Sequence, residues 1–237
     1  MPKSALEKFS VGFLKSPIGK TIARIGLANG MSGEYLKGPK LDQARSDYAG
    51  LLEGSVLQLG PGTGRDLNYF PGDRVTRVVA IDMYPSEQCL DTANRAGLDF
   101  HLFQGDLDNP RAFKQLEGEQ FDCVFISMTG CLLKDPVATL AMASHSLKMG
   151  GRLILLEHGL SHDPEIQADQ LDPQFSANWA EAAHGCVLTN DWGSIVEQAG
   201  FVIESYEERE VDGLAPFQNP LYCIEAVKAI ESINVLN

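Results

Sequence analysis

With 237 residues, of which 44% are hydrophobic, the chain can bury one sizeable core, which fits a single domain with an N-terminal extension. Its formal net charge of -13 argues against nucleic acid as a partner, because a duplex-binding surface needs clustered cations. The five cysteines form no C-x-x-C motif, and no apolar run could span a bilayer or form a signal peptide. We therefore expect a cytoplasmic protein with no metal, no disulfide framework and no transmembrane segment.

The first 45 residues differ from the remainder because they carry eight lysines and arginines against three acidic residues. Apolar residues recur there at near-helical intervals, interrupted by Ser16-Pro17, which predicts two short amphipathic helices. We expect residues 1–50 to form a helical extension and residues 51–237 to form the main domain. The extension could simply pack on the domain, cover the active site as a lid, or contact a membrane surface.

Strands and helices are then predicted to alternate along the chain. Helices are expected at 41–52, 65–70, 86–96 and 136–148, and strands at 55–59, 77–82, 99–104, 121–127 and 150–157. The strand at 77–82 is a continuous run of Val and Ile, as expected for a strand covered on both faces. This alternation predicts a doubly wound α/β fold with a parallel sheet.

The last third of the chain changes this pattern. Residues 179–183 and 192–199 are predicted to be helical, and residues 201–208 and 222–229 to be strands joined by a loop without a helix. Strands with so short a connection are antiparallel neighbours. We therefore predict a mostly parallel seven-stranded sheet that is closed by an antiparallel C-terminal hairpin.

A glycine loop follows the first predicted strand, with Gly60, Gly62 and Gly64 directly after an apolar run. Such a loop turns tightly enough for a ligand to lie against bare peptide groups. It lacks the Lys-Ser/Thr of a P-loop and the G-x-G-x-x-G spacing of a dinucleotide site. Asp82 ends the next strand, where an α/β nucleotide site places a carboxylate on the ribose hydroxyls, and Asp106 follows the third strand.

These three motifs together resemble the cofactor site of class I S-adenosylmethionine-dependent methyltransferases, over residues 55–228. The resemblance implies the same fold, S-adenosylmethionine as the cofactor, and methyl transfer as the activity. It also implies that the three glycines form the cofactor loop and that Asp82 binds the ribose. The other cofactor contacts that it implies are Met83, Asp106 and Leu107 around the adenine, and Ser127 and Met128 beneath the sulfonium.

A finer resemblance lies in residues 150–158, Trp179, residues 185–192 and residues 199–201. These segments are similar to the branch that contains the thiol S-methyltransferases of the methyltransferase-like seven group. Two departures are the lack of that group's apolar N-terminal anchor, and His184 in place of its acid before Gly-Cys. The resemblance therefore supports a small, largely apolar acceptor more than it supports a thiol.

The catalytic candidates are histidines, because a thiol could react as its thiolate with little help but a hydroxyl acceptor would need a base. His158 follows the fifth predicted strand and His184 precedes Gly185, so both are candidates for acceptor contact or catalysis. Phe175, Trp179 and Tyr222 could line an apolar substrate pocket. The sequence leaves two alternatives open, a non-methylating cyclisation, elimination or rearrangement and a non-catalytic partner subunit, and it leaves the oligomeric state undetermined.

Overall fold

A computed structural model describes residues 36–229, so the helices predicted within residues 1–35 lie outside the described residues. The strands are β1 (Gly54–Leu59), β2 (Val75–Asp82), β3 (Phe100–Gln104), β4 (Phe121–Ser127), β5 (Leu147–His158), β6 (Phe201–Arg209) and β7 (Leu221–Lys228). The α-helices are α3 (Pro39–Ala49), α4 (Glu87–Arg95), α5 (Pro110–Phe113), α6 (Pro136–His145), α7 (Pro164–Gln170), α8 (Pro173–Ala182) and α9 (Trp192–Gln198). Short 3-10 turns are η1 (Arg65–Tyr69), η2 (Lys114–Leu116), η3 (Gly130–Leu132) and η4 (Pro216–Gln218).

The seven strands form one sheet in the order β3-β2-β1-β4-β5-β7-β6. The pairs from β3 to β5 are parallel, whereas β7 is antiparallel to both β5 and β6. The predicted parallel sheet with an antiparallel C-terminal hairpin is therefore confirmed. Because β1 and β4 lie side by side at the centre, the loops after them meet at one edge of the sheet.

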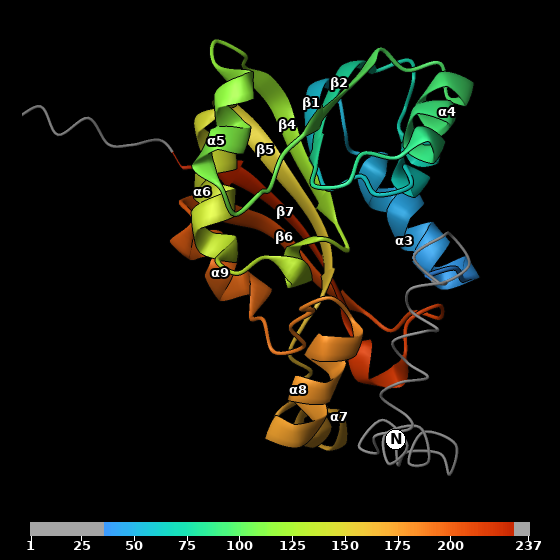
Figure 1. The fold of residues 1–237 in the computed structure, drawn as a ribbon, viewed down its shortest axis with the longest axis vertical. Helices are drawn as coiled ribbons and strands as arrows, with labels where there is room; N and C mark the ends of the chain where they lie inside the picture. The colour runs from blue at the N-terminus through green and yellow to red at the C-terminus, as the bar shows by residue number, and fades with distance from the viewer. Residues whose placement is uncertain (1–35, 230–237) are drawn as a thin grey trace, which may run out of the picture.

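Helices cover both faces of the sheet (Figure 1). One core cluster joins Leu57, Ile126 and Leu155 of the strands to Leu140 of α6 and Trp192 of α9. The other face packs on α3 and α4, and its largest strand side chain is Phe125, which is fully buried. Strand β2 is therefore buried on both faces, since Val79 and Ile81 belong to one cluster and Val78 to the other, as its continuous run of Val and Ile predicted.

Several predicted element bounds were wrong. The first crossover is a 3-10 turn, and the helix predicted to reach residue 148 ends at His145, after which β5 already begins at Leu147. Helix α8 starts at Pro173 rather than near Trp179, because the Asp172 side chain caps it by accepting the Phe175 N–H at 2.7 Å. Helix α7 was not predicted, although Asp163-Pro164 gives it the same kind of start.

Helix α3 packs in the core and fixes the chain beside the glycine loop. Its Arg45 is buried and pairs with buried Asp66 at 3.0 Å, just after that loop. Arg45 also donates to the carbonyl of Leu36 at 2.9 Å, and Arg65 donates to the same oxygen. Residue 36, where the described chain begins, is therefore tied to the turn that follows Gly64. None of the helices within residues 36–229 is long and apolar enough to cross a membrane.

Candidate active site

The glycine loop turns back from the end of β1 through three left-handed glycines. Gly60, Gly62 and Gly64 have φ angles of 64°, 56° and 78°, a region that residues with a Cβ rarely adopt. A Cβ on Gly60 would lie 2.3 Å from Cγ2 of Thr129, so this loop and the turn after β4 are in direct contact. Beside Gly62, in contrast, a Cβ would meet nothing within 4 Å. The loop therefore presents bare backbone to open space at its centre.

Asp82, the last residue of β2, holds this loop in place. Its carboxylate accepts the N–H of Gly62 at 2.9 Å and the N–H of Tyr84 at 2.8 Å. Ser86, the N-cap of α4, donates its hydroxyl to the carbonyl of Gly62 at 3.0 Å. The predicted ribose acid and the predicted loop are thus brought together. Met83 and Tyr84 follow with large exposed apolar surfaces, 42% and 77% exposed respectively.

Asp106 and Leu107 lie beyond the end of the neighbouring strand β3. The Asp106 carboxylate accepts the N–H of Asp108 at 3.0 Å and lines an open hollow of about 400 Å³ together with Lys134. Leu107 is buried in the core against the sheet. The hollow includes no residue of the glycine loop, so it is separate from the loop's open side.

The turn after β4 carries the residues predicted beneath the sulfonium. Ser127 is buried and donates to Asp66 at 3.4 Å, while Met128 adopts a left-handed conformation with a φ of 52°. Such a conformation costs a residue with a Cβ about 1–3 kcal/mol and is concentrated at functional sites. The Thr129 hydroxyl donates to the carbonyl of Gly60 at 2.8 Å, which ties the strained turn to the glycine loop.

A buried carboxylate, that of Glu157, binds the backbone of the turn after β4. Glu157 of β5 is fully buried and accepts the backbone N–H of Thr129 at 2.5 Å and that of Gly130. Burial raises the pKa of Glu157 to about 7, against the lowering effects of His158 and of these two backbone donors. Sequence reasoning missed this role, although Glu157 ends the apolar strand predicted at 150–157, as Asp82 ends the strand predicted at 77–82.

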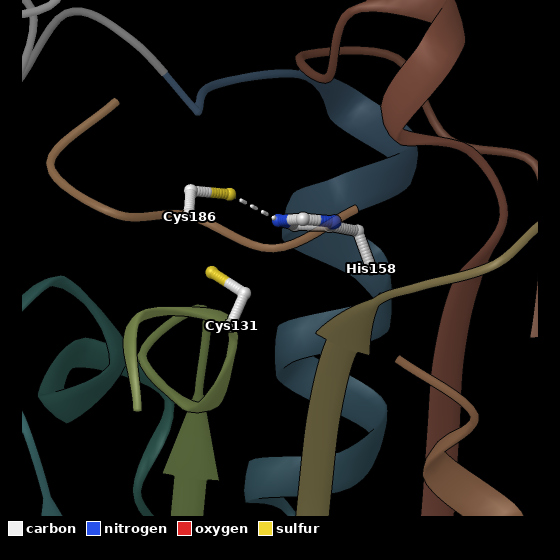
Figure 2. A group of neighbouring side chains, drawn as sticks. All are labelled: Cys131, His158 and Cys186. Carbon is white, nitrogen blue, oxygen red and sulfur yellow. Dashed lines mark hydrogen bonds between the residues drawn. The ribbon is translucent and has the colours of Figure 1, made fainter. Parts of the chain in front are cut away.

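His158, the last residue of β5, lies against two cysteines. Its Nε2 is 3.1 Å from Sγ of Cys186, and Cys131 of η3 completes the group (Figure 2). The Cys131 thiol and His158 hold the pKa of Cys186 well below its usual value, while Cys131 itself stays protonated with a raised pKa. Burial opposes protonation of His158, but the Cys186 thiolate raises the pKa of the imidazole above its usual value. Sequence reasoning identified His158 but missed both cysteines as site residues.

His184 is not part of this group. It has a φ of 56° and an exposed side chain, and Gly185 follows with a φ of 98°. These two left-handed residues reverse the chain after α8 and direct it to Cys186, whose N–H donates to Ala183 at 3.0 Å. The structure therefore places His158 inside the candidate site and the His184 side chain on the surface beside it.

The two cysteines belong to an apolar cluster of buried side chains. It consists of Cys131, Phe175, Trp179, Ala183, Cys186, Leu188 and Phe217. Phe217 makes edge-on contacts with both Phe175 and Trp179, at centroid distances of 5.1 and 4.8 Å. Two of the three predicted pocket aromatics thus share a cluster with Cys186, which contacts His158. The third, Tyr222 of β7, belongs instead to the core cluster that contains Trp192 and Leu140. Its hydroxyl donates to the carbonyl of Leu160.

Comparisons with known proteins agree with this architecture. The sequence profile of the family described as "Methyltransferase domain" matches residues 28–206. No curated protein matches the chain in sequence. An O-methyltransferase family protein from Burkholderia thailandensis is a similar solved structure, with a TM-score of 0.56 and 18% identity over 81% of this chain and 57% of that one. This chain therefore spans little more than half the length of that protein.

Two further similar structures match over nearly their whole length. The 1,6-didemethyltoxoflavin-N1-methyltransferase of Burkholderia thailandensis, solved with 1,6-didemethyltoxoflavin and S-adenosylhomocysteine, has a TM-score of 0.60 and 16% identity over 97% of this chain and 93% of that one. The [4+2]-cyclase SpnF has a TM-score of 0.62 and 14% identity over 89% and 96%. At these identities the structural likeness shows the fold, and the family match over more than half of the chain shows the family. The chain therefore belongs to the methyltransferase-domain family, and its seven-stranded sheet has the class I methyltransferase fold.

Proposed function

We propose that this methyltransferase methylates a thiol or hydroxyl group of a small, largely apolar molecule. The observation that carries the proposal is the aromatic cluster of Phe175, Trp179 and Phe217 beside Cys131 and Cys186. This cluster adjoins the turn after β4, which contacts the glycine loop through Thr129. In open α/β sheets, ligands bind beyond the carboxyl ends of the strands, so methyl donor and acceptor would meet here. An acceptor that lies against these aromatic side chains would be apolar on that side.

We also propose that the residues assigned from the family resemblance bind the cofactor. When the cofactor binds, the Asp82 carboxylate would give up the N–H of Gly62 and accept the ribose hydroxyls instead. Exposed Met83 would pack on the adenine. Gly62 has the open space that a close-lying ligand needs. Ser127, Met128, Asp106 and Leu107 stay proposals of the same kind, at the ends of β4 and β3.

His158 and His184 stay the catalytic candidates of this proposal. His158 is supported by its place at the end of β5, in contact with Cys186 and the apolar cluster. His184 has the weaker support, because its exposed side chain would have to turn toward the acceptor. The segments that resemble the thiol S-methyltransferases, including Gly185-Cys186, support a small, largely apolar acceptor more than they support a thiol in particular.

The direct test of the acceptor is a panel of small thiols and phenols, with the release of S-adenosylhomocysteine as the readout. We expect turnover with apolar members of the panel and none with RNA, DNA or protein. Activity confined to those macromolecules would contradict the proposal. The similarity to the [4+2]-cyclase SpnF keeps a non-methylating reaction as the alternative. Consumption of a substrate without release of S-adenosylhomocysteine would favour that alternative.

A glycine pair provides a test of the cofactor loop. Gly62→Ala and Gly97→Ala both force alanine into a left-handed conformation, with φ angles of 56° and 68°, and both face open space. Each should therefore lose a similar free energy of unfolding, about 1–2 kcal/mol. Only Gly62→Ala should weaken the binding of S-adenosylhomocysteine in calorimetry, because only its methyl group enters the proposed cofactor space. Equal affinities in the two variants would remove Gly62 from the cofactor site.

The prediction that residues 1–30 cover the site, as a lid rather than as a membrane anchor, falls outside the described residues. Its support is that residue 36 is tied to Arg65, directly after the glycine loop. We expect deletion of residues 1–30 to lower the methyl-transfer rate severalfold with little change in melting temperature, because a lid excludes water and positions the acceptor. A folded truncated protein with the full rate would exclude a lid. Binding of the full chain to anionic vesicles tests the alternative of surface contact with a membrane, and a cytoplasmic location stays a proposal.

A further inference from the structure

Two thiols and one imidazole lie close together at the carboxyl ends of β4 and β5, and none of them is among the residues proposed to bind the cofactor (Figure 2). The ligand atoms of Cys131, His158 and Cys186 all lie within 4.8 Å of one another. In tetrahedral zinc sites the bonds are about 2.3 Å to sulfur and about 2.0–2.1 Å to nitrogen, so the ligand atoms stand roughly 3.6–3.8 Å apart. The one shorter distance, 3.1 Å between His158 Nε2 and Cys186 Sγ, and the 4.8 Å limit for the group lie on either side of this spacing, so side-chain shifts of about 1 Å or less would seat a zinc ion.

The backbone holds each of the three residues in place. The carbonyl of Cys131 accepts the N–H of Val187 at 2.8 Å, which joins η3 to the Cys186 segment. The carbonyl of His158 accepts the indole N–H of Trp192 at 2.8 Å. Because these bonds do not involve the thiols or the imidazole, the fold sets the positions of the three groups without using their ligand atoms, which contact one another.

The surroundings favour a soft cation over other ligands. The three residues are 4%, 1% and 5% exposed, and the aromatic cluster excludes water from the thiols. Thiols are weak hydrogen-bonding groups, so two thiols and an imidazole satisfy one another poorly in such a place. Thiolate and imidazole ligands select zinc among the common divalent cations, whereas magnesium and calcium prefer oxygen.

The number of ligands indicates the type of site. Among residues 36–229, no further His, Cys, Asp or Glu joins the group. Three protein ligands with one open position are the pattern of catalytic zinc sites, whereas structural sites have four protein ligands. We propose that Cys131, His158 and Cys186 bind a zinc ion whose open position takes the sulfur of a thiol acceptor. The zinc site stands on its own geometry, but the role of its fourth position rests on the proposed methyl transfer to a small apolar molecule.

The chemistry of such a site is balanced without any further reactant. The two cysteines release their thiol protons to bulk solvent when zinc binds, and the acceptor thiol releases its proton to bulk solvent as it enters, because zinc binds thiolates. A sulfur electron pair of the acceptor then forms the new bond to the methyl carbon of S-adenosylmethionine. The bond between that carbon and the sulfonium breaks, and its electron pair stays on the cofactor sulfur. The products are a methyl thioether and S-adenosylhomocysteine, and His158 acts as a ligand rather than as a base.

This inference departs from the expectation, drawn from cysteine spacing, that the protein holds no metal. Its first test is zinc binding to the full chain, reduced and stripped with a chelator, in competition with a chromophoric indicator. We expect one zinc ion per chain, and more than roughly 100-fold weaker binding for Cys131→Ala and Cys186→Ala, because even outer-shell substitutions cost 10–100-fold. Cys223→Ala, a matched loss of a buried thiol from β7, should bind zinc as the wild type does. Folding of each variant is checked by its melting curve.

Two further measurements separate the parts of the proposal. Cobalt replaces zinc as a spectroscopic probe, and benzyl mercaptan should change the thiolate-to-cobalt absorption whereas benzyl alcohol should not. Calorimetry with S-adenosylhomocysteine tests the methyltransferase function independently. Cofactor binding without zinc binding in the wild type would overturn the zinc site and leave the function standing. Zinc binding without a response to benzyl mercaptan would overturn the role of the fourth position, and zinc binding retained by both Cys131→Ala and Cys186→Ala would overturn the ligand assignment.

Discussion

Replacing Glu157 by alanine is expected to lower the free energy of unfolding by about 2–6 kcal/mol. The carboxylate is fully buried and accepts the backbone N–H groups of Thr129 and Gly130, so its loss leaves two donors without a partner. An unsatisfied buried donor costs about 1–3 kcal/mol, and the total stability of a domain is about 5–15 kcal/mol. Urea unfolding at fixed pH measures the change.

Two control variants make this prediction specific. Glu157→Gln keeps an oxygen acceptor of the same shape, so it should recover most of the lost stability. Glu204→Ala removes a carboxylate from an exposed position of β6 and should stay within about 0.5 kcal/mol of the wild type. If Glu157→Ala were as stable as Glu204→Ala, the carboxylate would not support the turn after β4.

The same variant should also affect the cofactor site. Thr129 ties that turn to Gly60, and Met128 between the strand and Thr129 is held in a strained conformation. A turn that loses its two bonds to Glu157 can relax the strain at Met128 and release Gly60. We therefore expect weaker binding of S-adenosylhomocysteine to Glu157→Ala, even at temperatures where the variant is fully folded.

The fold could be predicted because its signals are local. Apolar strand runs, the three glycines and the acid after β2 each stand in one short stretch of sequence. Glu157 carried a usable signal as well, an acid at the end of an apolar strand, and the Asp-Pro pairs before α7 and α8 marked two helix starts. The short connection between α6 and β5 gave no such signal, because the apolar spacing continues through it.

The cysteine and histidine group could not be predicted, because its members come from three separate segments. His158 and Cys186 are 28 positions apart, and Cys131 belongs to a turn after another strand. No spacing rule for metal sites covers such a set, since the sheet order and the reversal at His184 and Gly185 bring the residues together. The strain at Met128 was equally hidden, because a left-handed conformation is expected of glycine rather than of methionine.

Replacing Asp82 by alanine is expected to weaken cofactor binding by roughly 10- to 150-fold, because hydrogen bonds to charged groups contribute about 1.5–3 kcal/mol. The carboxylate accepts the N–H groups of Gly62 and Tyr84, so its removal also frees the centre of the glycine loop. Asp99→Ala is the matched control, since it removes an exposed carboxylate just before Phe100, the first residue of β3, and changes the net charge equally. Calorimetry with S-adenosylhomocysteine should show a large loss for Asp82→Ala and none for Asp99→Ala. Equal affinities would mean that the Asp82 carboxylate contributes nothing to cofactor binding and that the ribose is bound elsewhere.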